Sequence, residues 1–263
     1  MRSTKAADLS SAKSKLTRAR HHLNLLKSEM DAVYSPGTIH LEHLIRDDGR
    51  VHAYTVHGLP SIPVEWSGII GDCVHNARSS LDHLAYETVL ALGGTPIDGP
   101  GGTMFPVRLR VGAPLTFKGL SNSPAILESV LDSVQPRNAN SGIIGLYLGV
   151  LDELDVRDKH RRLLVVQHAS NDLEASWGGQ LDTPRPEVDV VEEGFVEGDE
   201  VIRLTYPTPV VDFDPFPSLP IRALLEPDLP IWTKRERMSV DRFLEDILII
   251  TQRIIGKFED QVL

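Results

Sequence analysis

The segment 61–94 predicts one long helix, and this helix constrains the fold more than any other part of the chain. Its apolar side chains recur every three or four residues, which places them on one side of an α-helix. They are Ile70, Val74, Ala77, Leu81, Leu84, Ala85 and Leu92. We expect Ser61 to cap this helix, Pro63 to lie in its first turn, and Gly93 and Gly94 to end it. Its apolar side must be buried against other elements of a core.

The opposite side of this helix carries titratable and hydrogen-bonding groups in place of the Lys and Glu that are usual on a solvated helix face. The polar residues that follow one another at spacings of three and four are Asp72, His75, Asn76, Ser79, His83 and Glu87. These spacings align their side chains over about four turns. Because imidazole exchanges protons near neutral pH, this side is a candidate catalytic site, with His75, Asn76 and His83 as candidate catalytic residues.

Further segments have the apolar spacing of helices, namely 8–34, 124–154 and 238–260. Within 124–154 we expect a short helix at 125–134, ended by Pro136, and a second helix at 141–154. In 8–34 the apolar residues follow in unbroken steps of three and four, as in a helix packed lengthwise on another helix. We expect this segment to pack against the helix of 61–93, although a coiled-coil dimer would use the same residues. Ser239 is the expected N-cap of the last helix.

The β elements are expected at 38–58 and 162–214, where runs rich in β-branched residues are separated by glycine-containing turns. Together these patterns predict an α+β fold in a single domain, 1–263. We expect a bundle of three long helices plus short helices, with a β-hairpin after the first helix and a small antiparallel sheet inserted before the last helix.

The first β element has the residue pattern of a hairpin. Asp48 and Gly49 suit the two central positions of a type I′ turn, and with them as the loop His40 lies opposite His57. Glu42 follows on the same face of the sheet. Two imidazoles and a carboxylate on one face are acceptable metal ligands, but cross-strand histidine pairs without a metal are ordinary, and we favour the latter interpretation.

The charge of the chain is unevenly distributed. A net charge of −10 argues against a protein that coats nucleic acid over its whole surface. Residues 1–34, however, hold seven Lys or Arg against three Asp or Glu, whereas acidic residues dominate 182–228. We interpret the basic end as a contribution to solubility, with polyanion binding as the alternative.

The expected cellular location of the protein follows from the absence of a membrane-spanning segment and of a signal peptide in the sequence. No apolar run is long enough to span a bilayer, and the N-terminal residues have no apolar core of a signal peptide. The single cysteine, Cys73, excludes an internal disulfide framework and a thiolate zinc site. We therefore expect a cytoplasmic protein with no membrane partner and no cofactor.

A second candidate site is the charged segment 155–162, which the pattern places at a helix-to-strand junction. Lys159, Arg161 and Arg162 are candidate phosphate-binding residues, because Lys and Arg supply both charge and hydrogen-bond donors. His160 beside them is a candidate for proton transfer. In the alternative interpretation these cations only offset the negative end of the helix dipole.

The sequence from Arg78 to His83 matches the pattern R-x4-H and resembles the HEPN superfamily of helical nucleotide-binding proteins and ribonucleases. The wider pattern D-x-x-H-N-x-R-x-x-L-D-H-L, with D-K-H-R downstream, is similar to uncharacterised bacterial proteins. The resemblance implies metal-independent cleavage of RNA, with His83 exchanging a proton and Arg78 stabilising charge on the phosphate, at the interface of a homodimer.

The chain departs from the family at Ser79, where active members often have Asn, Asp or His. In a regular helix Arg78 and His83 also point about 140° apart.

Two other functions remain open. Asp72, His75 and His83 are possible ligands of a divalent metal in a hydrolase, with His160 as a distant fourth. Alternatively, the polar side of the helix is a buried hydrogen-bonded network without a reaction, in a protein that binds a protein partner through its acidic flank.

Overall fold

The computed structural model describes residues 7–35, 37–110, 112, 115–160, 165–169, 184–191, 195–211, 221–225 and 239–263. For His160 and for 165–169 and 221–225 it describes the backbone alone. The described residues form α-helices and antiparallel strands, so the predicted α+β class is confirmed.

The chain divides into two compact units. Unit 1 comprises 1–27, 65–163 and 227–263, and unit 2 comprises 28–64 and 164–226. The prediction of a single domain stays a prediction, because this division does not test whether either unit folds alone.

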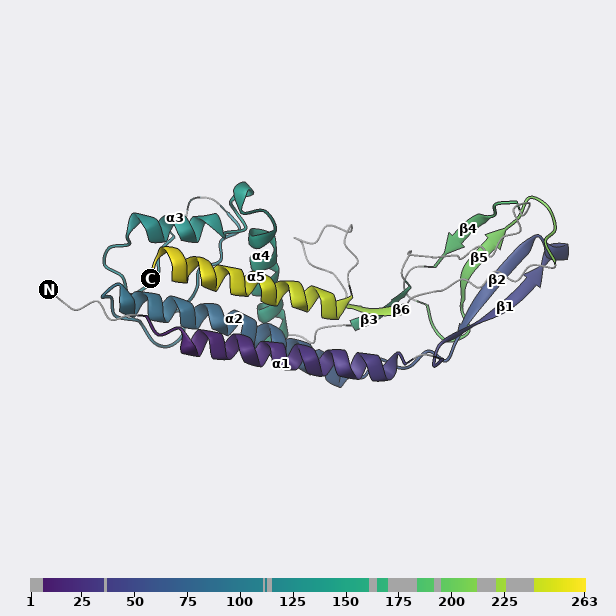
Figure 1. Ribbon diagram of the computed structural model, residues 1–263, viewed down its shortest axis with the longest axis horizontal. Helices are drawn as coiled ribbons and strands as arrows, with labels where there is room; N and C mark the ends of the chain where they lie inside the picture. The colour runs from purple at the N-terminus through teal and green to yellow at the C-terminus, as the bar shows by residue number, and fades with distance from the viewer. Residues whose placement is uncertain are drawn as a thin grey trace. The chain divides into compact units, whose positions relative to one another are not determined.

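Unit 1 is built from helices. They are α1 (Ser10–Val33, of which 28–33 belong to unit 2), α2 (Glu65–Ala91), α3 (Ala125–Ser133), α4 (Gly142–His160) and α5 (Val240–Gln261). In Figure 1, α1, α2 and α5 run alongside one another and α4 crosses them. None of the described helices is long and apolar enough to cross a membrane.

The core of unit 1 lies where α2 meets its neighbours. The predicted apolar side of α2 is fully buried from Ile70 to Ala85, whereas Leu92 lies just past the helix and is half-buried. The rings of Phe105, Phe117 and Phe258 pack with centroids 5.7–6.0 Å apart. Burying each of these large apolar side chains contributes about 1.5–3 kcal/mol, so this contact region holds the helices together.

Helix α1 packs within the same unit. Its predicted seam is buried at Leu9, Ala12, Leu16, Ala19, Leu23 and Leu26. The Ser11 hydroxyl lies 3.0 Å from a ring nitrogen of His83 on α2, and Lys13 pairs with Glu259 on α5. The expected packing on α2 is therefore present, and the seam is covered within the chain from Leu9 to Leu26, whereas Met30 and Val33 at its end are half-buried.

Helix α2 begins later than predicted. It starts at Glu65, so Ser61 is not its N-cap and Pro63 lies before the first turn. A proline disfavours helical geometry in the residue that precedes it, which keeps Ile62 out of the helix. The predicted end is confirmed: Gly93 has a φ of +75°, and the Gly94 N–H donates to the Val89 carbonyl at 2.8 Å.

Helix α4 extends six residues beyond its predicted end at Leu154 and continues to His160. Two ion pairs at a spacing of four residues support this extension, namely Arg157 with Glu153 and Lys159 with Asp155. The prediction of a junction loop at these positions is therefore wrong, because residues 155–160 are helical.

Unit 2 contains a four-stranded antiparallel sheet. Its order is β1 (His40–Arg46), β2 (Val51–His57), β5 (Glu200–Thr205), β4 (Glu187–Val190). The hairpin and the later strands thus form one sheet, whereas the sequence suggested two. A separate pair joins β3 (Val165–Ala169) to β6 (Ile221–Leu225). Val210 and Val211, near the end of the predicted β region 162–214, are not part of a strand, and 212–214 lie outside the described residues.

The hairpin has the predicted register. His40 pairs with His57, and Glu42 pairs with Thr55. Asp48 has φ 54° and ψ 34°, and Gly49 has φ 91°. These are the left-handed conformations of a type I′ turn, so the turn is confirmed together with the register.

We expect Gly58→Ala to destabilise the protein more than Gly37→Ala. Both glycines have positive φ, 75° and 85°, so both substitutions carry backbone strain of about 1–2 kcal/mol. A Cβ at Gly58 would also collide with the Thr38 carbonyl, whereas a Cβ at Gly37 meets nothing within 4 Å. The collision adds about 1–3 kcal/mol. Urea denaturation measures both losses, and equal losses would contradict the predicted contact.

Candidate functional site

The polar side of α2 faces α4, and their side chains form one cluster. We call this the α2–α4 cluster; its members are Asp72, His75 and Ser79 on α2, and Asp155, Asp158 and Lys159 on α4. It combines residues of both sites that the sequence suggested, because the extension of α4 carries Lys159 beside the middle of α2.

His75 is the centre of this cluster. Its Nδ1 lies 3.0 Å from Oδ1 of Asp155, and its Nε2 lies 3.4 Å from the hydroxyl of Ser79. The other oxygen of Asp155 accepts a hydrogen bond from the Lys159 ammonium. The Asp155 side chain is only 6% exposed, whereas that of His75 is 47% exposed. A buried carboxylate thus holds an imidazole that is open to water.

This arrangement has a chemical consequence. In the neutral imidazole, an Nδ1–H that donates to Asp155 leaves Nε2 as the proton acceptor. A carboxylate that orients histidine in this way also stabilises the imidazolium that forms when Nε2 takes up a proton. The hydroxyl of Ser79 lies on the Nε2 side at a long hydrogen-bond distance, in the direction from which a proton would be transferred.

Asp158 brings further negative charge to the cluster. Burial raises the pKa of its carboxyl above the ordinary value of 3.8, and the nearby carboxylates of Asp155 and Asp72 raise it further, against the opposing effect of His75 and Lys159. The carboxyl lies directly against Gly71, where any Cβ would collide with it. The glycine therefore permits the close approach of α4 to α2 at this point.

Arg78 lies in the interior, and its donors are directed at protein groups. Its Nε donates to Asp152 at 3.0 Å, Nη1 to Asp82 at 2.6 Å, and Nη2 to the Phe105 carbonyl at 2.9 Å. Asp82 also accepts from the Phe105 N–H at 2.8 Å. Arg78 is 5% exposed. Burial alone would lower its pKa, but the ion pairs with Asp82 and Asp152 outweigh this and raise it.

The structure separates His83 from Arg78. The half-buried ring of His83 bonds Ser11 on α1, while Arg78 binds α4 and the segment at Phe105. His75 and His83 are eight positions apart in a regular helix, which is about 12 Å along its axis. The two residues of the R-x4-H pattern therefore do not converge on a common point.

Asn76 lies in the interior and contributes locally. It is 7% exposed, and its side-chain amide donates to the Asp72 carbonyl one turn earlier at 2.8 Å. Of the predicted phosphate-binding residues, Lys159 is exposed and bonded to Asp155, while Arg161 and Arg162 lie outside the described residues. His160 ends α4, and its side chain is outside the description as well.

Neither predicted set of metal ligands is assembled. Among the residues that the structure describes, no group of three or more His, Cys, Asp or Glu side chains could hold a metal ion. On the hairpin, His57 instead bridges two carboxylates, with Nε2 3.2 Å from Glu42 and Nδ1 3.1 Å from Glu197. The hypothesis of a metal-dependent hydrolase on Asp72, His75 and His83 gains no support from this geometry.

The network interpretation placed the polar side of α2 against the Asp158 segment, but it named neither Asp152 nor Asp155 as a partner. Asp152, Asp155 and Asp158 follow one another at spacings of three, which aligns them along one side of α4. This spacing is visible in the sequence, but the predicted end of the helix at Leu154 divided the series. The pairing of Asp155 with His75, which lies 80 positions earlier, has no local signal.

No family model, curated protein or solved structure matches the chain. The resemblance to the HEPN superfamily therefore stays a prediction.

We expect Arg78→Ala to lower the free energy of unfolding by about 3 kcal/mol, because it leaves Asp82, Asp152 and the Phe105 carbonyl without their common donor. Arg78→Lys should recover only part of this loss, since an ammonium cannot reproduce the planar fork of donors.

The matched control is the exposed Arg242 on α5, whose ion pairs span 3.8–4.0 Å. Arg242→Ala should cost less than about 1 kcal/mol in urea denaturation. Similar losses for Arg78 and Arg242 would contradict the structural role.

We expect Asp158→Asn to stabilise the protein at neutral pH. Because the pKa of Asp158 is raised on folding, the folded state holds its proton to higher pH, and stability falls as pH rises through the interval above 3.8. Asparagine cannot ionise, so it removes this pH-dependent loss of stability. The increase in the free energy of unfolding should therefore be present near neutral pH and shrink as the pH approaches 3.8. Thermal unfolding across this range is the measurement, with the exposed Asp260→Asn as control. A gain that is independent of pH would contradict the repulsion.

Proposed function

We propose that the chain cleaves RNA by metal-independent acid–base catalysis, and that His75 is the residue that exchanges the proton. The observation that carries this proposal is the hydrogen bond between the exposed imidazole of His75 and the buried carboxylate of Asp155. A histidine oriented in this way is suited to take a proton from a hydroxyl group. The choice of RNA rests on the resemblance of the segment from Arg78 to His83 to HEPN ribonucleases.

The reaction follows from the free side of the imidazole. Nε2 of His75 accepts the proton of a ribose 2′-hydroxyl, and the 2′-oxygen attacks the adjacent phosphorus. The bond from phosphorus to the 5′-oxygen then breaks, and the leaving oxygen takes a proton from water or from the imidazolium. A substrate hydroxyl would replace Ser79, whose own contact with Nε2 is long at 3.4 Å.

Charge in the α2–α4 cluster limits how a phosphate can bind. Asp72, Asp155 and Asp158 repel an anion, whereas Lys159 neutralises Asp155. The raised pKa of Asp158 favours uptake of a further proton. The cluster is thus less repulsive to a phosphodiester in mildly acidic solution than at high pH.

The proposal assigns Arg78 a different role from the one that the resemblance implies. Its contacts with Asp82, Asp152 and Phe105 hold α2, α4 and the segment at Phe105 together. Arg78 then acts on catalysis only through the positions of these elements. Lys159 is an exposed cation of the cluster, but its ammonium is bonded to Asp155, so it would stabilise charge on a phosphate only by giving up that ion pair.

We expect His75→Ala to reduce cleavage of a labelled single-stranded RNA in EDTA by at least about a hundredfold, which is the typical contribution of a general base. Since the ring is half exposed, the free energy of unfolding should fall by no more than about 1 kcal/mol. His83→Ala is the matched control, since its ring bonds Ser11 on another face, and it should retain cleavage. Cleavage that survives His75→Ala but is lost in His83→Ala would transfer the role to His83.

A second candidate function is that of a non-catalytic protein that binds a partner. The enclosed network of Arg78 favours it, because this network stabilises the helices without leaving a donor for a substrate. If the protein is a non-catalytic binding protein, neither the wild-type chain nor its variants should cleave RNA above the level of a mock purification. The same experiment therefore decides between the two functions.

A further inference from the structure

Helices α1 and α5 are joined by a regular series of polar contacts. Lys13 pairs with Glu259 at 2.8 Å, and Lys27 pairs with Glu245 at 3.0 Å. Successive contacts are seven residues apart on both helices, which run in opposite directions. Lysine and glutamate at such spacing flank the seam of two packed helices and contribute mainly to register.

The middle contact of this series differs from the other two. Here Arg20 faces the neutral side chain of Gln252, and its Nη2 lies 3.4 Å from the amide oxygen. Among the described residues, no carboxylate forms an ion pair with Arg20. The exposed guanidinium of Arg20, which has five hydrogen-bond donors, therefore carries a positive charge that no described carboxylate offsets. It lies midway between two ion pairs.

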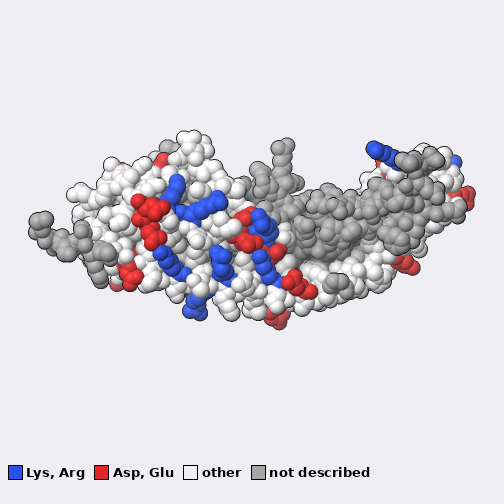
Figure 2. Space-filling model, viewed as in Figure 1, with Lys and Arg blue, Asp and Glu red and all other residues white. Residues whose placement is uncertain are grey.

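The surroundings of Arg20 are basic although the whole chain is acidic. Residues 9–27 and 247–258 contain no Asp or Glu. Apart from Lys13 and Lys27, which are paired with Glu259 and Glu245, their cations are Lys15, Arg18, Arg20, Arg253 and Lys257. Figure 2 shows Lys and Arg side chains gathered on the face that α1 and α5 share, with acidic side chains toward either end. This local field attracts an anion despite the net charge of −10.

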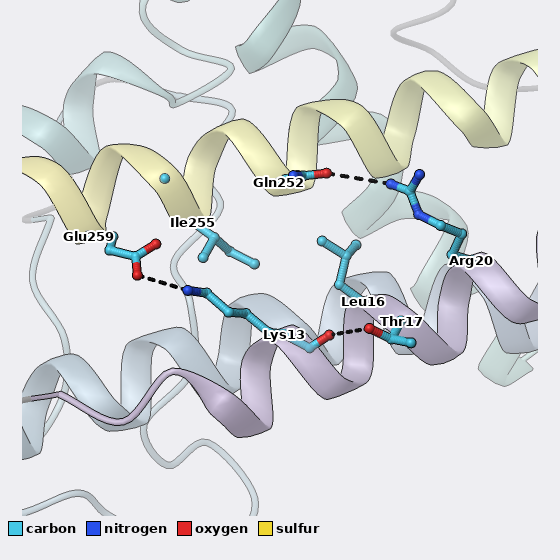
Figure 3. Close-up of a pocket in the computed structure, with 8 residues that line it drawn as sticks. Lys13, Leu16, Thr17, Arg20, Gln252, Ile255 and Glu259 are labelled. Carbon is cyan, nitrogen blue, oxygen red and sulfur yellow. Dashed lines mark hydrogen bonds and ion pairs between the residues drawn. The ribbon is translucent and has the colours of Figure 1, made fainter.

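A groove of ≈ 540 Å³ opens beside Arg20, between α1 and α5 (Figure 3). Gly256 is one of the residues that line it, and a Cβ at this position would meet nothing within 4 Å. The buried residues Leu16 and Ile255 contribute apolar surface, and Thr17 and Gln252 contribute polar groups. Glu259 also lines the groove, but Lys13 neutralises it.

We propose that this groove binds the phosphodiester backbone of a nucleic-acid strand, with Arg20 holding a phosphate and the space above Gly256 receiving the attached sugar. The inference rests on the proposed function for the choice of nucleic acid, and on the geometry for the site. A guanidinium is matched to the paired oxygens of a phosphate. Leu16 and Ile255 line the groove but are only 8% and 3% exposed, so the choice of a nucleic-acid strand over an acidic peptide rests on the proposed function.

The test is the binding of a fluorescein-labelled oligouridylate by the full chain at low salt, followed by anisotropy. A His75→Ala background keeps the strand intact. We expect Arg20→Glu to weaken binding by about tenfold or more, and to reduce the slope of log affinity against log salt by about 0.7, as for one lost phosphate contact. Gly256→Glu, which fills the groove and improves helix propensity, should weaken binding similarly.

Arg18→Glu is the matched control, because it makes the same change of charge on the same helix. Arg18 lies two residues before Arg20 and hence about 160° away around α1. It should weaken binding by less than about threefold. If Arg18→Glu and Arg20→Glu weaken binding equally, a diffuse charge effect replaces the proposed site. Unchanged oligouridylate binding by Gly256→Glu would also overturn the site.

Other probes separate the remaining outcomes. A DNA strand of equal length tests whether the sugar matters, and binding of both strands through Arg20 supports a backbone site. A polyglutamate peptide that binds as tightly as the oligouridylate would overturn the assignment to nucleic acid. Loss of cleavage in His75→Ala is a separate readout. If the strand binds through Arg20 but the wild-type chain does not cleave it, the proposed function is rejected and the groove is retained. If the wild-type chain cleaves RNA but Arg20→Glu binds the strand as tightly as before, the groove is rejected and the proposed function is retained.

Discussion

The helical unit depends on one buried positive charge, the guanidinium of Arg78. A charge in the interior is costly unless each of its donors finds a partner, and here two carboxylates and a carbonyl supply them. The partners come from α2 itself, from α4 and from the segment at Phe105. Satisfying Arg78 therefore requires α4 to cross α2 at one position, and that crossing places Asp155 beside His75. The candidate site is a consequence of the same contact that holds the helices together.

The α2–α4 cluster brings three carboxylates, one imidazole and one ammonium close together. Asp155 serves both His75 and Lys159, and Asp158 lies against a glycine in a position where its carboxyl is repelled by two others. Repulsion between carboxylates persists only where the surrounding structure holds them in place, and such perturbed groups concentrate at functional sites. His75, beside these carboxylates, is open to water, whereas Arg78 is enclosed, and the proposed function assigns proton transfer to the first and support to the second.

Charge is distributed differently on the face formed by α1 and α5. There the carboxylates lie at the ends of a series of contacts, and the centre is basic. The two proposals assign complementary roles to these regions. A cationic groove can hold a backbone through charge, whereas an acidic cluster with an oriented imidazole can move a proton but binds an anion weakly. Both regions belong to unit 1, so one helical unit carries them.

Patterns with a short range were readable in the sequence. The apolar side of α2 from Ile70 to Ala85, the seam of α1 and the register that pairs His40 with His57 depend on neighbours within a turn of helix or across one hairpin. The end of α4 was misplaced, because charged residues in 155–160 resemble a terminus until their pairing one turn apart is considered.

The roles of the polar residues were decided by the tertiary structure. Arg78, His75 and His83 lie on one helix and share one sequence pattern, yet one is enclosed, one is held open to solvent and one contacts α1. The partners that create this difference lie about seventy to eighty positions away in the chain, on α4 or near the N-terminus. No local spacing specifies such pairs, because they depend on the angle and depth at which helices pack.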